Sequence, residues 1–351
     1  MIAHHDLEDL RTDQGALLLL AGQQGATKAA LVSALHELSP HRVVDLAGAT
    51  EPRAAVAELR RCAAPGEMPA VHVAAIIDAA TLFHDLGCYD LLRDRGWAIH
   101  PGDARTVADV VCETLEYAHT CVLVVSAPEN HTAEVETIIR TMNPTAELVR
   151  WTPGDRVPHA LRSARVDLPP PDGGAAWELA LAGPERANHA SRTRFFYAAR
   201  TPFHPARLSE WLIQRWPGLL RVKGRIFIAN RLDHVLGLSQ AGGVRRVFQL
   251  GRWWSAEPLD RWPTDPSVRA AIRARMVGPF GDREQRIALV GRNLDAEQLT
   301  LTLDKCLLHP DEIARGAEAW ARFPDPLAAL EASWPIGALT TVGRDASTTL
   351  H

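Results

Sequence analysis

A chain of 351 residues, 46% of them hydrophobic and 23% charged, is long enough for two domains and has the composition of a globular protein. The formal net charge is −4 and the arginines and lysines form no continuous run, so no nucleic-acid binding through a direct basic patch is expected. The apolar stretches are strand-sized and too short to span a membrane. Five scattered cysteines without a Cys-x-x-Cys pair argue against a disulfide framework, and residues 1–14 do not have the layout of a signal peptide. We therefore expect a cytoplasmic protein.

The first ordered elements are predicted within residues 17–35. The apolar run Leu17–Ala21 reads as a buried strand, Gly22 and Gly25 mark a turn, and Lys28 precedes leucines at helical spacing. A strand, a glycine turn and a helix form the context of a phosphate-binding P-loop, although any strand–turn–helix unit with two glycines looks similar.

The P-loop sequence motif, G-x-x-x-x-G-K-[ST], is incomplete in this chain. Thr27 replaces the second glycine, which places a Cβ where the backbone approaches phosphate closely. Ala29 replaces the hydroxyl residue that would bind Mg²⁺, while Lys28 can still meet a phosphate as a point charge. The sequence thus predicts a vestigial or weak phosphate site.

Alternating strands and helices continue to residue 151 and predict an α/β domain. Strands are expected at 42–46, 71–77, 121–125 and 146–150, and helices at 52–62, 105–119 and 134–142. Apolar strands that alternate with amphipathic helices indicate a parallel sheet covered on both faces. We assign residues 1–151 to this shortened parallel-sheet domain.

A proline- and glycine-rich connector, residues 152–191, is predicted next, with one helical piece near 175–181. A smaller α+β domain follows over residues 192–326, and a tail over 327–351. Its predicted strands are 194–199, 225–229, 235–240, 245–250 and 286–290, and its predicted helices are 205–215 and 295–307. Turn residues between the middle strands favour a mainly antiparallel sheet.

Several motifs in the first domain are similar to those of the CobW family of P-loop GTPases. The stretch Val43–Pro52 resembles the family's acidic-residue, glycine and Glu/Asp-Pro signature, and Ile76–Asp85 resembles its strand-Asp-Ala segment. The second domain resembles the family's carboxy-terminal domain in Arg200–Leu208, Gly251–Trp254 and Leu307–Ile313. The resemblance implies a GTP-binding domain joined to a smaller domain, with roles in delivering zinc or cobalt or in metal limitation.

The resemblance also implies roles for individual residues. Asp45 and Gly48 have the spacing of the Asp-x-x-Gly turn that holds Mg²⁺ and the γ-phosphate. Where the family reads guanine with Asn-Lys-x-Asp, this chain has Ser126–Glu129, in which only Glu129 keeps the acceptor chemistry; an ordinary strand-to-helix loop explains this stretch equally well. The nucleotide-binding residues, vestigial or weak, are expected to be Gly22, Gly25, Thr27, Lys28, Asp45, Gly48 and Glu129.

The largest departure from the family pattern lies between Lys28 and Asp45. The family usually inserts several dozen residues there, with a switch segment and a Cys-x-Cys-Cys metal motif, and this stretch has no cysteine. His84 and Cys88, four residues apart, are too few for a tetrahedral metal site, so no metal ligand is predicted and zinc is doubtful. GTP, with Mg²⁺, remains a possible ligand, and any enzymatic activity would be weak GTP hydrolysis.

Three hypotheses follow from these patterns. The first is a degenerate CobW-like protein that acts through a protein partner in metal homeostasis or metal limitation. The second is an active GTP-dependent metallochaperone whose metal ligands come from elsewhere in the chain. The third is a module that binds another small ligand in the vacated cleft at the carboxyl ends of the strands.

Overall fold

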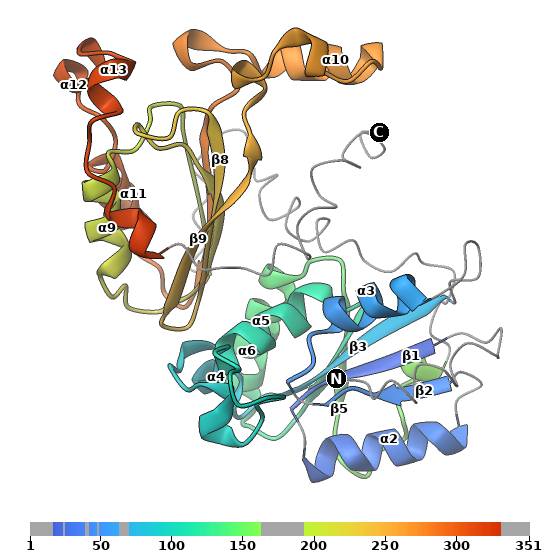
Figure 1. Cartoon of the computed structure of the whole chain (residues 1–351). Helices are drawn as coiled ribbons and strands as arrows, with labels where there is room; N and C mark the ends of the chain where they lie inside the picture. Colours follow the sequence, from blue (N-terminus) through green and yellow to red (C-terminus); the bar gives the residue numbers. More distant parts are fainter. Residues whose placement is uncertain are drawn as a thin grey trace. The chain divides into compact units, whose positions relative to one another are not determined.

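The computed structural model describes residues 17–23, 25–38, 42–47, 49–62, 70–162 and 193–330. The chain divides into two compact units near residue 180, and each is described by itself (Figure 1). Gly48 and the helix expected near 175–181 lie outside the described residues.

The first unit is built on a five-stranded sheet in which every pairing is parallel. The strand order is β2-β1-β3-β4-β5, so the chain reverses its direction of winding after β2. The strands are β1 (Leu17–Gly22), β2 (Arg42–Asp45), β3 (Val71–Asp78), β4 (Thr120–Val124) and β5 (Glu147–Trp151). β1 and β3 are central and almost wholly buried, which explains their uninterrupted apolar sequences.

Helices cover both faces of this sheet (Figure 1). The helices of the unit are α2 (Ala26–Leu38), α3 (Pro52–Cys62), α4 (Leu82–Gly87), α5 (Val107–Tyr117), α6 (Glu129–Met142) and α7 (His159–Arg162). Leucines of α2 pack on one face, whereas α3 and the end of α5 pack on the other. The expected α/β architecture is confirmed.

The second unit contains a five-stranded sheet in the order β6-β10-β7-β8-β9. Its strands are β6 (Arg194–Ala199), β7 (Leu219–Ile226), β8 (His234–Ala241), β9 (Val244–Arg252) and β10 (Gln285–Gly291). β10 pairs antiparallel with both β6 and β7. The expected smaller α+β domain with an antiparallel sheet is therefore confirmed.

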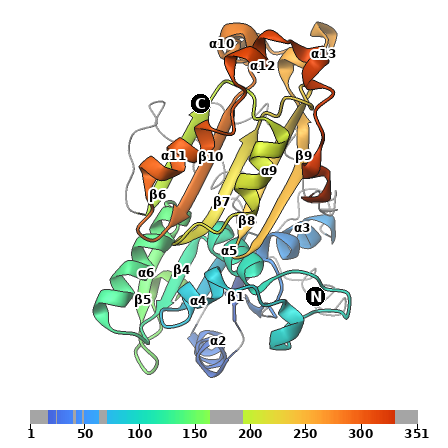
Figure 2. The same cartoon turned by 90° about the vertical axis from the view of Figure 1, so that its left-hand side faces the viewer.

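Two helices cover one face of this second sheet, as Figure 2 shows. They are α9 (Pro205–Ile213) and α11 (Ala296–Asp304), whose apolar side chains join the main core with Val222, Ile287 and Leu289. The unit also contains α10 (Pro266–Arg275), α12 (Pro310–Ala314), α13 (Ala317–Trp320) and a 3₁₀ turn, Pro326–Leu330. Leu327 is fully buried in the main core, so the chain is anchored at this turn.

Three boundaries differ from the sequence expectation by five residues or more. The strand expected at 225–229 is β7, at 219–226. Charged residues alternate with apolar ones along β7 and weaken its apolar signal, so the prediction fell on the more apolar residues that follow. Helix α6 starts at Glu129 and not at 134, since Thr132 N–H already donates to Pro128 O at 2.9 Å. Residues 152–162, expected in the connector, contribute buried Val157 and Leu161 to the first unit's core. No helix in the described part of the chain is long and apolar enough to cross a membrane.

Candidate nucleotide site

The loop between β1 and α2 is shaped by Gly22. Its φ of +127° lies in the region that favours glycine, and an added Cβ would stand 2.3 Å from the carbonyl oxygen of Ile76. Gly25, by contrast, has no heavy atom within 4 Å of an added Cβ, and its carbonyl accepts from Ala29 N–H at 3.0 Å. Gly22 is thus required by strand packing, while Gly25 faces open space at the start of the helix.

Lys28, in the first turn of α2, is buried, with only 2% of its surface exposed. Its ammonium donates to the carbonyl oxygens of Leu46 at 2.5 Å and Gly22 at 3.2 Å, and forms an ion pair with Asp45 at 2.7 Å. Burial lowers the pKa of Lys28 from its usual value, and Asp45 partly opposes this shift. Three protein oxygens therefore hold the charge that would otherwise meet a phosphate.

Asp45 reaches Lys28 because β1 and β2 run side by side. Asp45 is the last residue of β2 and pairs in register with Leu20, just before the glycine turn. Leu46 N–H continues the ladder by donating to Leu20 O at 3.0 Å. The structure thus brings together Asp45 and Lys28, two of the residues expected to bind nucleotide, and Thr27 in the first turn of α2 is half-buried.

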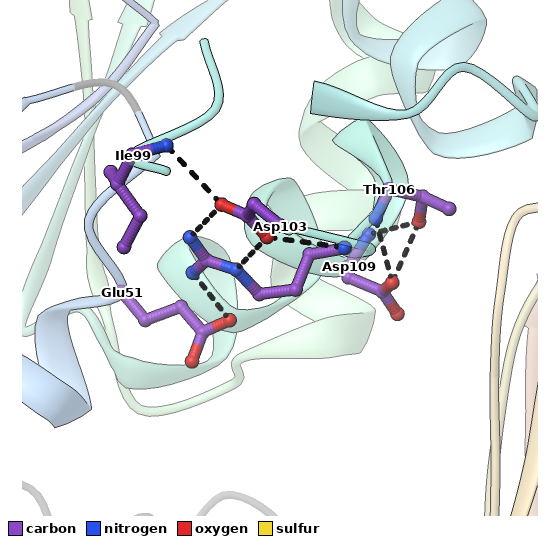
Figure 3. A network of polar contacts seen from close by, with 6 residues as sticks. Glu51, Ile99, Asp103, Thr106 and Asp109 are labelled. Atoms are coloured by element: carbon purple, nitrogen blue, oxygen red, sulfur yellow. Dashed lines mark hydrogen bonds and ion pairs between the residues drawn. The ribbon is translucent and has the colours of Figure 1, made fainter. Parts of the chain in front are cut away.

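An arginine that the sequence reading missed binds the segment after this turn (Figure 3). Arg105 donates to both carboxylate oxygens of Asp103, at 2.9 and 2.8 Å, and to Glu51 at 3.1 Å. These hydrogen bonds from Arg105 hold the pKa of Asp103 low, at about 2. Glu51 belongs to the Glu-Pro pair of the motif, so the network ties that pair to the loop before α5. Glu51 and Arg105 are 54 residues apart in the chain, so the sequence alone does not indicate that they interact.

Residues 126–129, in the place where the family binds the guanine base, make contacts within the protein. Glu129 begins α6, its side chain is 70% exposed, and it accepts two hydrogen bonds from Arg150, at 2.8 and 3.0 Å. Ser126 donates to the Asp78 carboxylate, which also accepts from Ala80 N–H at 2.8 Å. The contacts thus fit the ordinary strand-to-helix loop that the sequence left open.

A small cavity lies at the carboxyl ends of β1 and β3. Its lining includes Gly22, Gln23, Asp78 and Asp85. Gln23 donates to the fully buried carboxylate of Asp85, which also accepts from Arg95 at 3.2 Å. Gln23 and Asp85, two polar residues of this lining, are thus hydrogen-bonded within the protein.

The described residues contain no group of three or more His, Cys, Asp or Glu side chains that could hold a metal ion. Cys88 is buried, its thiol lies 3.3 Å from the Asp85 carbonyl oxygen, and burial raises its pKa. A raised thiol pKa disfavours the thiolate form that binds metals.

The fold and the site together define a class: a P-loop-type α/β unit followed by an α+β unit. Residues 193–307 match the family model for the cobalamin synthesis protein cobW C-terminal domain. A curated relative is the zinc chaperone Rv0106 of Mycobacterium tuberculosis, 32% identical over 233 residues, which are 64% of this chain and 55% of that protein. The zinc-regulated GTPase metalloprotein activator 1 of Dictyostelium discoideum is 26% identical over 266 residues, 72% of this chain and 55% of that protein.

A solved structure also matches. The Zn(II)-bound YjiA GTPase of E. coli is 11% identical with a TM-score of 0.33, and the match covers 85% of this chain and 100% of that one. The family model and the two curated relatives confirm the resemblance to the CobW family, which for the model covers residues 193–307. The chain spans about half the length of the curated relatives it matches, 55% in both cases.

Proposed function

We propose that this chain is a CobW-type protein of metal homeostasis, cytoplasmic in location, that has lost efficient GTP binding and acts through a protein partner. The observation that carries the proposal is the position of Lys28, whose ammonium is buried against Asp45 and two backbone carbonyls. A triphosphate would have to compete with all three oxygens for this lysine. The ion pair is already made, so the site gains little charge attraction for phosphate.

The residues present do not fit a Mg²⁺–nucleotide complex. Ala29 offers no hydroxyl to the cation, and Asp45, the remaining ligand candidate, is engaged by Lys28 at 2.7 Å. Glu129 is likewise engaged by Arg150 and is one methylene longer than the aspartate of the family's base-reading motif. Because phosphoryl transfer depends on positioning and charge stabilisation, these losses support a site without efficient hydrolysis.

The link to metal homeostasis rests on kinship. Two relatives carry names that refer to zinc. The described part of this chain has no group of three metal-ligating side chains. A role in which a protein partner holds the metal and this chain contributes a binding surface agrees with both observations.

Isothermal titration with GTP, in the presence and absence of Mg²⁺, tests this proposal. We expect no binding at micromolar concentrations, and the Lys28→Ala variant should behave like the unaltered protein. Micromolar binding that requires Mg²⁺ and disappears in Lys28→Ala would overturn the proposal. Asp45→Asn is the comparison variant for the titration without Mg²⁺, because it releases Lys28 from its ion pair and also removes the carboxylate that would bind the cation: in the absence of Mg²⁺, only a site whose lysine is sequestered should gain GTP affinity.

A second candidate, an active GTP-dependent metallochaperone, is favoured by the printed name of the Dictyostelium relative, a zinc-regulated GTPase. Under this alternative the chain hydrolyses GTP slowly, and zinc should change the rate of hydrolysis. Phosphate release from GTP, measured with and without Zn²⁺, separates the two candidates, because the degenerate protein should release none above the buffer rate in either condition.

A further inference from the structure

The cavity at the carboxyl ends of β1 and β3 has apolar walls that come from three elements. Six aliphatic side chains form these walls, and each is at most 7% exposed: Ile76 and Ile77 of β3, Leu82 of α4, and Val107, Val110 and Val111 of α5. Lys28 and Asp45 do not line this cavity. A ligand bound there would therefore not need the lysine that Asp45 holds.

Among the described residues, the cavity lining carries two charged side chains, and both are acidic. Asp85 accepts from Gln23 and from Arg95 at 3.2 Å, so its charge is balanced by the arginine. Asp78 makes no ion pair within the described part of the chain. The Asp78 carboxylate therefore gives the cavity an uncompensated negative charge.

One oxygen of the Asp78 carboxylate is left for a ligand. Asp78 is the last residue of β3, and its Oδ1 accepts from Ala80 N–H at 2.8 Å and from the Ser126 hydroxyl. Its Oδ2 accepts no hydrogen bond from any described residue. A carboxylate can accept at both oxygens, so Oδ2 is an acceptor still to be satisfied.

A buried hydroxyl in the same lining also lacks a partner. Thr114 of α5 is only 2% exposed, and within the described residues its side chain makes no hydrogen bond. Thr81, which precedes α4, lines the cavity as well, and its side chain does not cap that helix. Because a buried polar group without a partner costs free energy, these groups favour a bound molecule that can hydrogen-bond with them.

We propose that this cavity binds a small protonated amine with a short branched aliphatic body. The ammonium group has three donors, which can serve Asp78 Oδ2 and the Thr114 hydroxyl, and its charge matches that of Asp78. The aliphatic body would lie among the valine, leucine and isoleucine side chains, as in binding pockets that are mostly apolar with a few polar groups. This inference gives the small-ligand hypothesis a ligand class and does not depend on whether GTP binds at Lys28.

Saturation-transfer difference NMR on the full chain with three probes of one shape tests the ligand class. Isobutylamine should bind with a dissociation constant on the order of 1 mM, because so small a molecule makes few contacts. Isobutanol has a similar body without the charge and should bind about tenfold more weakly. Isovalerate carries a negative charge, which Asp78 repels, and should give no saturation transfer.

Three variants locate the site. Asp78→Asn keeps the Oδ1 acceptor and removes the charge, so isobutylamine should bind about tenfold more weakly. Thr114→Val keeps the shape and removes the hydroxyl, and the loss should be about fivefold. Asp155→Asn is the matched control, because Asp155 is exposed after β5 and does not line the cavity; it should leave binding unchanged.

The probe series needs no variant and can by itself overturn the proposal. An absence of saturation transfer to isobutylamine would contradict it, as would isobutanol or isovalerate binding as tightly as the amine. Equal losses in Asp78→Asn and Asp155→Asn would show that the amine associates with surface carboxylates in general. Each of these results can be obtained whether or not the GTP titration shows binding, so the two proposals fail separately.

Discussion

Gly22 and Gly25 look equivalent in the sequence but have different physical tasks. Gly22→Ala places a Cβ 2.3 Å from Ile76 O at a positive φ, so we expect a loss of at least about 2 kcal/mol in the free energy of unfolding. Gly25→Ala meets no atom within 4 Å and should cost less than about 1 kcal/mol, as the loss of an N-cap glycine. Urea denaturation of both variants measures the difference, and equal losses would contradict this assignment.

In the second unit, Arg207 and Glu312 form an ion pair whose contribution to folding stability depends on pH. Arg207 donates to both Glu312 oxygens, at 2.9 and 2.6 Å, and holds the pKa of Glu312 at about 2, below its usual 4.5. A lowered carboxyl pKa contributes stability above pH 4.5 that is lost as the pH falls towards 2.

Arg207→Gln should therefore lose about 2 kcal/mol at pH 6 and less at pH 3. Urea denaturation at the two pH values tests this expectation. An equal loss in the free energy of unfolding at both pH values would mean that the stabilisation by this pair does not depend on the charge of Glu312.

Between elements, Arg105 connects the Glu-Pro pair at the start of α3 to the loop before α5. Its removal leaves the Asp103 carboxylate, whose side chain is 2% exposed, without its cation. We expect Arg105→Gln to destabilise the protein by about 3 kcal/mol and to speed amide hydrogen exchange in residues 49–55. Arg93→Gln is the control. Arg93 is exposed and its ion pair with Asp94 is long, at 3.9 Å, so this variant should change stability and exchange little. Unchanged exchange in the Arg105 variant would show that the network does not hold this segment.

At this scale the sequence predicted most of the fold, because strands such as 71–78 and 17–22 are buried on both sides and read as apolar runs. It misplaced β7, in which charged residues alternate with apolar ones, and it missed the short helices α4, α7, α12 and α13, which span four to six residues. It also missed α10, which buries only Ile272. For the site, the motifs assigned Lys28 and Asp45 to one nucleotide pocket and did not indicate an ion pair between them. That Lys28 is also held by backbone carbonyls depends on chain geometry and could not be read from residue types.

On the scale of the whole molecule, each unit has its own hydrophobic core, so we expect two unfolding transitions. Gly22→Ala lies in the first unit and should lower the midpoint of one transition only. Differential scanning calorimetry of this variant beside the unaltered chain measures both midpoints. A single transition that shifts as a whole would indicate that the two units unfold together.

Lys28 should stay bound to Asp45 and to the carbonyls of Gly22 and Leu46 when guanine nucleotide is added. A crystal structure determined with a non-hydrolysable GTP analogue and Mg²⁺ tests it most directly. We predict an unchanged Lys28 ion pair and no triphosphate along the backbone of residues 22–28. A triphosphate seated there, with a six-coordinate cation beside Asp45, would contradict it.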